Sequence, residues 1–229
     1  MRSLYWSFGV KTDTCHIIRI PGHAQSCALA QRCADSVTAV GMRPEFWDAY
    51  DGTGAEIIPP AHHGQFMSML KLTDHYMTRS EVACALSHIS LWVQCVEQDR
   101  CMVILEHDAI MMARYPEHAL FNSLGFLGSA EQVKQQWQMR ATPPHGTDGH
   151  NRHFICRAHA YSIDPVVGKN LLSQVLKYGI SAPLDVMLRA DIVPMHQMAQ
   201  YAYDEQGPTT IKNRVKSGRA SMRNENLEI

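Results

Sequence analysis

A short apolar run that ends in acidic residues constrains the fold of this chain more than any other feature. Residues 101–105 read Cys-Met-Val-Ile-Leu, and Glu106-His107-Asp108 follow directly. Five consecutive apolar residues have the length of a β-strand, and a strand without alternating polar positions is covered on both faces. The run therefore predicts a sheet with helices on both sides, which is an α/β fold.

The rest of the chain supplies elements for such a sheet. Hydrophobic spacing and turn residues predict helices at 25–36, near 64–72, at 80–98 with Ser80 as its N-cap, at 165–178 and from 186, and strands at 15–20, 101–105, 121–128, 154–163 and from 193. We predict one α/β domain, residues 1–206, whose central sheet is mostly parallel. A polar, mobile surface segment is expected at 129–153, and a basic C-terminal tail at 207–229.

Composition narrows the class of protein. Apolar residues make up 45% of the chain and charged residues 19%, which excludes wholesale disorder. No apolar run approaches the roughly 20 residues of a membrane span, and the N-terminus does not resemble a secretion signal. The seven cysteines include no Cys-x-x-Cys pair, so we expect reduced thiols. A cytoplasmic protein without a transmembrane segment is the expectation, in the host cytoplasm if the chain is viral.

The acidic end of the apolar strand is the sharpest chemical feature. Side chains alternate along a strand, so Glu106 and Asp108 are expected on one side, with His107 pointing away. Ligands bind at the carboxyl ends of strands in open α/β sheets. Two carboxylates there suit a hard divalent cation that also binds phosphate oxygens. The alternative is that the acidic residues only mark where the strand exits into solvent.

The residues around this strand resemble a known family. The segment Arg79-Ser-Glu-Val-Ala-Cys-Ala-Leu-Ser-His-Ile-Ser-Leu-Trp92, followed by Val103-Ile-Leu-Glu-His-Asp-Ala109, is similar to the signature block of glycosyltransferase family 25. Weaker matches follow the family order at 49–52, 158–172 and 183–185. The family includes lipopolysaccharide-type sugar transferases and collagen galactosyltransferases.

The resemblance implies a fold and a reaction. It implies a GT-A-type, Rossmann-like fold, a nucleotide-sugar donor, often a UDP-sugar, and inversion at the anomeric carbon. A Mn²⁺ or Mg²⁺ ion would bridge the donor diphosphate, and a carboxylate base would deprotonate the acceptor hydroxyl. The acceptor expected for the family is a surface glycan.

The resemblance also assigns roles to residues of the donor and metal site. Glu106 and Asp108 are expected to bind the metal and diphosphate, and Asp51 the nucleoside. Arg79 is a candidate for the diphosphate, or else a solvated residue before a helix. His88 is a candidate donor contact, or else a core histidine that a backbone carbonyl satisfies.

Two further candidates lie late in the chain. Asp185, in Pro183-Leu-Asp185, is the candidate general base; a cap for the helix from 186 is an equally good interpretation. His196 is a candidate late metal ligand of the kind that some GT-A enzymes use.

Two other functions stay open. The basic residues between Lys212 and Arg223 could contact phosphates, so the acceptor could be a hydroxylated base in DNA, as in viral DNA modification. A catalytically inactive module that binds a glycan or nucleotide is the other alternative. It is favoured by His107 in place of a family Asp, and by the lack of a clear family Asn-Leu-x-Arg after the first strand. Metal-dependent nucleotide release would separate an enzyme from such a module.

Overall fold

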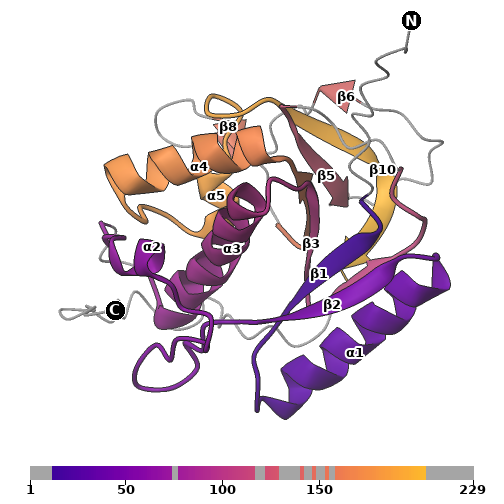
Figure 1. The fold of residues 1–229 in the computed structure, drawn as a ribbon, viewed down its shortest axis with the longest axis horizontal. Coiled ribbons are helices and arrows are strands. Elements are labelled where there is room, and N and C mark those ends of the chain that lie inside the picture. The colour runs from indigo at the N-terminus through magenta and orange to yellow at the C-terminus, as the bar shows by residue number, and fades with distance from the viewer. Residues whose placement is uncertain are drawn as a thin grey trace, which may run out of the picture.

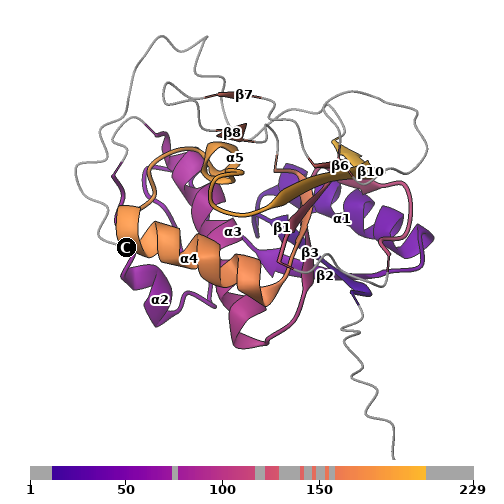
Figure 2. The same cartoon turned by 90° about the horizontal axis from the view of Figure 1, so that it is seen from above.

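The protein is described by a computed structural model that covers residues 12–73, 77–116, 122–128, 140–141, 146–147, 153–154 and 158–204. It forms one α/β domain around a curled sheet (Figures 1 and 2). The helices are α1 (Ala24–Ala39), α2 (Gln65–Ser68), α3 (Arg79–Glu97), α4 (Pro165–Tyr178) and α5 (Leu184–Met187). The strands are β1 (Thr14–Arg19), β2 (Arg43–Asp48), β3 (Met102–Glu106), β4 (Ala109–Met111), β5 (Leu124–Gly128), β6 (Arg140–Ala141), β7 (Gly146–Thr147), β8 (His153–Phe154), β9 (Ala160–Ile163) and β10 (Met195–Asp204).

The central sheet is mixed, so the prediction of a mostly parallel sheet is wrong. Its order is β2-β1-β3-β9-β5-β10-β4, with β6 also paired to β10. The pairs β1–β2, β1–β3 and β5–β10 are parallel, whereas β9 runs antiparallel to both of its neighbours, as do β4 and β6 to β10. All four residues of β9 are buried. The sequence predicts a strand here but carries no signal for its direction, which depends on the strands it pairs with.

Helices cover both faces of the sheet, as the apolar run 101–105 predicts. Val103 and Leu105 pack with α1 residues in one buried cluster. Ile104 packs in a second cluster with residues of α3 and α4. The alternation along β3 therefore directs the side chain of Glu106 toward α3, on the same face as Ile104.

The predicted helices are confirmed, with corrected ends. Helix α3 begins after Thr78, whose side chain accepts a hydrogen bond from the Glu81 N–H while the Glu81 carboxylate accepts one from the Thr78 N–H. This capping box makes Thr78 the N-cap instead of Ser80. Asp164 caps α4, which spans the predicted range.

Four strands and several boundaries differ from the sequence prediction. β2, β4, β6 and β7 have no counterpart in it, and the predicted strand 154–163 divides into the end of β8 and the whole of β9. The basic tail 207–229 and most of the polar segment 129–153 lie outside the described residues. Within the described part of the chain, every helix is too short or too polar to cross a bilayer.

Candidate functional site

A cavity lies where the carboxyl ends of the parallel strands meet. Its walls come from the end of β1, the segment after β2, the first turns of α3 and the end of β3. Its volume is about 80 Å³. This is the position at which open α/β sheets bind ligands.

Close packing holds α3 against the segment after β2. A Cβ atom on Gly52 would lie 2.4 Å from the Arg79 carbonyl oxygen, so only glycine allows this approach. The Ser80 hydroxyl donates to the Gly52 carbonyl oxygen (3.2 Å), and the Tyr50 N–H donates to the Ser87 hydroxyl (2.9 Å). The Asp51-Gly52 pair thus serves a helix–loop contact as well as a turn.

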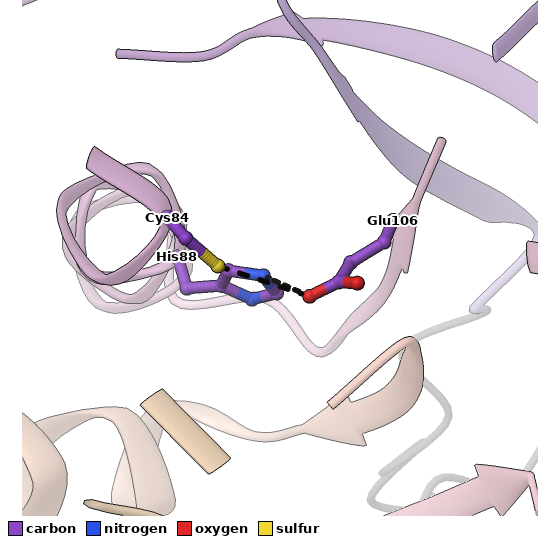
Figure 3. Close-up of side chains that lie close together, drawn as sticks. All are labelled: Cys84, His88 and Glu106. Atoms are coloured by element: carbon purple, nitrogen blue, oxygen red, sulfur yellow. Dashed lines mark hydrogen bonds and ion pairs between the residues drawn. The ribbon is translucent and has the colours of Figure 1, made fainter. Parts of the chain in front are cut away.

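Three chemically different donor groups meet on the cavity wall (Figure 3). Cys84 and His88, four residues apart on one face of α3, point toward Glu106 at the end of β3. Cys84 Sγ lies 3.9 Å from Glu106 Oε1, and His88 Nε2 lies 3.3 Å from the same oxygen. All three ligand atoms lie within 4.8 Å of one another, close enough to share one metal ion.

A buried hydrogen-bond chain orients His88. The Trp92 indole N–H donates to the hydroxyl oxygen of Tyr161 (2.9 Å), and that hydroxyl lies 2.8 Å from His88 Nδ1. The rings of His88 and Tyr161 are stacked, and both side chains are fully buried. His88 is therefore a buried histidine, but its partners are a side-chain hydroxyl and the site carboxylate instead of a backbone carbonyl.

The surroundings of Glu106 and Asp108 shift the pKa values of these two carboxylates in opposite directions. Burial acts to raise the pKa of Glu106, but the nearby imidazoles of His88, His159 and His107 outweigh it and lower that pKa. Burial and the charge of Glu106 raise the pKa of Asp108 to about 7. Glu106 therefore carries a negative charge at neutral pH. Asp108 is about half protonated at neutral pH when no cation is bound.

Among the described residues, Asp108 has a buried carboxylate oxygen that is available to a ligand. It lines the same cavity as Glu106, and its Oδ1 is buried without a hydrogen-bond partner among the described residues. A buried, unpaired carboxylate oxygen is costly unless a cation or proton satisfies it. Carboxylate oxygens are the ligands that Mg²⁺ and Mn²⁺ prefer.

His107, which the sequence predicts to point away from Glu106 and Asp108, is also among the residues that line the cavity. Its Nδ1 lies 3.1 Å from the Ser26 hydroxyl of α1. Strand β3 ends at Glu106, and residues 107–108 form a turn. The alternation of side chains therefore stops one residue before His107.

Other predicted residues lie beside the cavity. The Asp51 carboxylate accepts hydrogen bonds from the N–H and hydroxyl of Thr53, which itself lines the cavity. Arg79 is the first residue of α3, against Gly52. Asp185 lies in the first turn of α5, where its carboxylate accepts from the Val186 N–H; the N-cap is Pro183.

Asp185 also acts electrostatically on the site. Burial raises the pKa of the Cys84 thiol well above its usual value, and the charges of Glu106, Asp185 and Asp108 add to this effect. The Asp185 carboxylate is therefore near enough to the cavity wall to act on a group within it, although it does not line the cavity.

His196 is not brought to this site. It pairs with Gly125 of β5, which pairs with Ser162 of β9, which pairs with Val103 of β3. His196 therefore lies in the sheet row of Val103, three strands away from β3 and near the end opposite Glu106. Its Nδ1 is buried without a hydrogen-bond partner among the described residues.

Sequence reasoning gave no role to three residues of the site. Cys84, Trp92 and Tyr161 were noted only as parts of the family pattern, yet they contact or orient Glu106 and His88. The i, i+4 spacing of Cys84 and His88 is a visible signal, because it places a thiol and an imidazole on one helix face. Tyr161 carried no such signal, since its partners come from another element.

These features define an α/β protein with an acidic ligand site at the carboxyl ends of its parallel strands. The model of glycosyltransferase family 25, described as an LPS biosynthesis protein, matches residues 30–188. This match covers most of the chain and includes α3, β3 and the cavity between them, so the protein belongs to glycosyltransferase family 25. No curated protein matches the chain. Membership of this family indicates a transferase that acts on a sugar donor and an acceptor.

Proposed function

We propose that the protein transfers a sugar, with inversion, from a nucleotide-sugar donor to a hydroxyl group of a surface glycan, with UDP-sugars as the first donors to test. The observation that carries the proposal is that Glu106 and Asp108 line one cavity at the carboxyl ends of the parallel strands. Family membership supports the transferase class.

The proposed cofactor is Mn²⁺ or Mg²⁺, held by Glu106 and Asp108. The buried, unpartnered Asp108 Oδ1 and the adjacent Glu106 carboxylate fit such an ion. A bound divalent cation would neutralise charge on the diphosphate as the nucleotide leaves. The side chains of the protein position the two carboxylates: the buried His88 holds Glu106 from one side, and the 107–108 turn presents Asp108 from the other.

The remaining residues are proposed to bind the donor around this centre. Asp51 is proposed to recognise the nucleoside, because its carboxylate already orders Thr53 at the cavity edge. The guanidinium of Arg79, at the start of α3, is proposed to pair with the diphosphate. His88 is proposed to act through Glu106, because its ring is fully buried.

Asp185 is proposed as the general base. Its carboxylate lies near enough to the cavity wall to raise the pKa of the Cys84 thiol. It would accept the proton of the acceptor hydroxyl as that oxygen attacks the anomeric carbon opposite the leaving diphosphate. Asp185→Asn is therefore expected to lower kcat and to leave the KM for the donor nearly unchanged.

A panel of nucleotide-sugars tests the proposal. Release of nucleoside diphosphate is measured with glycan acceptors, in the presence of Mn²⁺, Mg²⁺ or EDTA. We expect release only with a divalent ion, and loss of it in Asp108→Asn. Asp35→Asn, which changes an exposed acid on α1, is the matched control and should keep the wild-type rate.

The outcomes separate the competing functions. Donor binding without turnover in any combination would contradict the proposal and support an inactive binding module. Transfer to hydroxymethylated DNA but not to glycans would change the acceptor and leave the donor site intact. Product anomeric configuration, read by NMR, tests inversion directly.

A further inference from the structure

We propose that Cys84, His88 and Glu106 form a binding site for Zn²⁺ within the cavity. The site has three protein ligands, from a thiolate, an imidazole and a carboxylate, and a fourth position that faces the cavity. Zinc binding itself does not depend on the proposed transferase activity. It differs from the proposed Mn²⁺ or Mg²⁺ site, which uses only carboxylate oxygens.

The distances from Glu106 Oε1 to the other two ligand atoms match a four-coordinate zinc ion. Zn–S bonds of about 2.3 Å and Zn–N and Zn–O bonds of about 2.1 Å, at tetrahedral angles, place sulfur and oxygen about 3.6 Å apart and nitrogen and oxygen about 3.4 Å apart. The corresponding distances are 3.9 Å between Cys84 Sγ and Glu106 Oε1 and 3.3 Å between His88 Nε2 and Glu106 Oε1. Cys84 Sγ and the His88 nitrogen lie within 4.8 Å of each other, against about 3.6 Å in a tetrahedral site, so shifts of up to about 1 Å would complete the site.

The imidazole is oriented for metal binding through Nε2. Nε2 of the fully buried His88 faces Cys84 and Glu106, and it lies 3.3 Å from Glu106 Oε1. The opposite nitrogen, Nδ1, contacts the Tyr161 hydroxyl, as metal-binding histidines contact a partner through their second nitrogen. With zinc bound, Nδ1–H would donate to a Tyr161 lone pair that the Trp92 indole does not use.

The donor set selects the metal. Thiolate and imidazole favour Zn²⁺ over Mg²⁺, Mn²⁺ and Ca²⁺, which prefer oxygen ligands. On binding, a Zn–S bond replaces the S–H bond of Cys84, and the proton goes to solvent. The fourth position would hold a water from the cavity, as in zinc sites with three protein ligands.

Zinc binding has a consequence that rests on the proposed function. Glu106 cannot be a zinc ligand and also hold the Mn²⁺ or Mg²⁺ of the donor diphosphate in the same geometry. Zn²⁺ is therefore expected to inhibit sugar transfer, and excess Mn²⁺ should not reverse the inhibition as readily as a zinc chelator does.

Cobalt titration tests the site without any donor or acceptor. Co²⁺ is added to the full chain, stripped of metal and kept reduced, and the absorption of a cobalt–thiolate bond is followed. We expect one equivalent of Co²⁺ to give a thiolate charge-transfer band and four-coordinate d–d bands, and one equivalent of Zn²⁺ to remove both. Cys84→Ser should abolish the charge-transfer band, and His88→Gln should weaken Co²⁺ binding at least tenfold.

Cys27→Ser is the matched control, because Cys27 is also half-buried but lies on α1. It should keep the band. Absence of the band in the wild type, or its persistence in Cys84→Ser, would overturn the proposal. Circular dichroism checks folding; if Cys84→Ser does not fold, an unchanged cobalt spectrum in folded His88→Gln and Glu106→Gln contradicts the site equally well.

The activity measurement separates the two proposals. Inhibition by Zn²⁺ is expressed relative to the zinc-free rate of each variant, and Cys84→Ser should need at least tenfold more Zn²⁺ for half-inhibition. A cobalt band in a protein with no transferase activity would support the zinc site and contradict the proposed function. Transferase activity in a protein that gives no cobalt band would support the proposed function and contradict the zinc site.

Discussion

The two halves of the central sheet differ in the directions of their neighbouring strands. In the parallel half, β2-β1-β3, three carboxyl ends meet at one edge, and residues from the ends of β1 and β3 and after β2 line the cavity. In the other half, β9 runs against both neighbours, so its amino end lies beside the carboxyl end of β3. β5 and β10 run in the same direction as β3, whereas the carboxyl ends of β9, β4 and β6 lie at the opposite edge.

Position along the strands explains where the predicted residues lie. Glu106 ends β3 and Asp108 lies in the turn after it, and both line the cavity. β5 and β10 run in the same direction as β3, because β9 is antiparallel to both β3 and β5 and β10 is parallel to β5. His196 lies at the start of β10, so it falls in the row of Val103, near the edge opposite Glu106. A residue can be placed at the carboxyl edge of a sheet only when the direction of its strand and its position along that strand are both known.

The largest expected effect comes from substituting one predicted metal ligand in each half of the sheet and comparing the two variants. Glu106→Gln should reduce metal-dependent nucleotide release by about a hundredfold or more, because it removes a charge beside the diphosphate. His196→Ala should change the rate and the metal concentration for half-maximal activity less than about twofold. A large loss in His196→Ala would show that β10 contributes to the site after all.

The packing of the parallel half against α3 predicts the next effect. Gly52→Ala should lower the free energy of unfolding by about 1–3 kcal/mol, because the new Cβ would meet the Arg79 carbonyl oxygen. Gly54→Ala is the control in the same loop, where the nearest atom to a new Cβ is 4.0 Å away. Urea denaturation of both variants measures the difference. Equal stabilities would mean that α3 can move away from the loop.

Two buried tyrosines sharpen the comparison between the sheet faces. Tyr161→Phe removes the hydroxyl that orients His88, and Tyr115→Phe removes one that contacts Ser162 at 2.8 Å in the opposite cluster. Each should cost about 1–2 kcal/mol of unfolding free energy. Only Tyr161→Phe should also reduce kcat, by about tenfold, and shift the acid limb of the pH–rate profile, because Glu106 loses its oriented partner. If Tyr161→Phe and the wild type have the same pH–rate profile, Tyr161 contributes to packing only.

A pH-dependent effect on stability should follow from the raised pKa of Asp108. In EDTA, the folded state keeps a proton on Asp108 up to about pH 7, whereas the unfolded chain loses it near pH 4. The unfolding free energy should therefore fall as pH rises from about 4 to 7, by at most about 1.4 kcal/mol per pH unit. Asp108→Asn should remove this contribution and be more stable than wild type at pH 7.5. If the unfolding free energies of the wild type and Asp108→Asn change with pH in parallel, the prediction is contradicted.

The predictable part of the site was local in sequence. The helix over α3, the apolar strand β3 and the acidic residues after it are each visible in a short window, and Cys84 and His88 are four residues apart. The end of the alternation at Glu106, which brings His107 into the cavity, was not visible, because it depends on where β3 stops pairing.

The sequence by itself determined the α/β class, the main helices, the buried strand and the family block around residues 79–109, because periodicity and capping act over a few neighbouring residues. Only the tertiary structure decided that β9 is antiparallel, that Tyr161 orients His88, and that Cys84, His88 and Glu106 converge. Strand direction and register come from pairing between segments far apart in the chain, and no local pattern of polarity encodes that pairing.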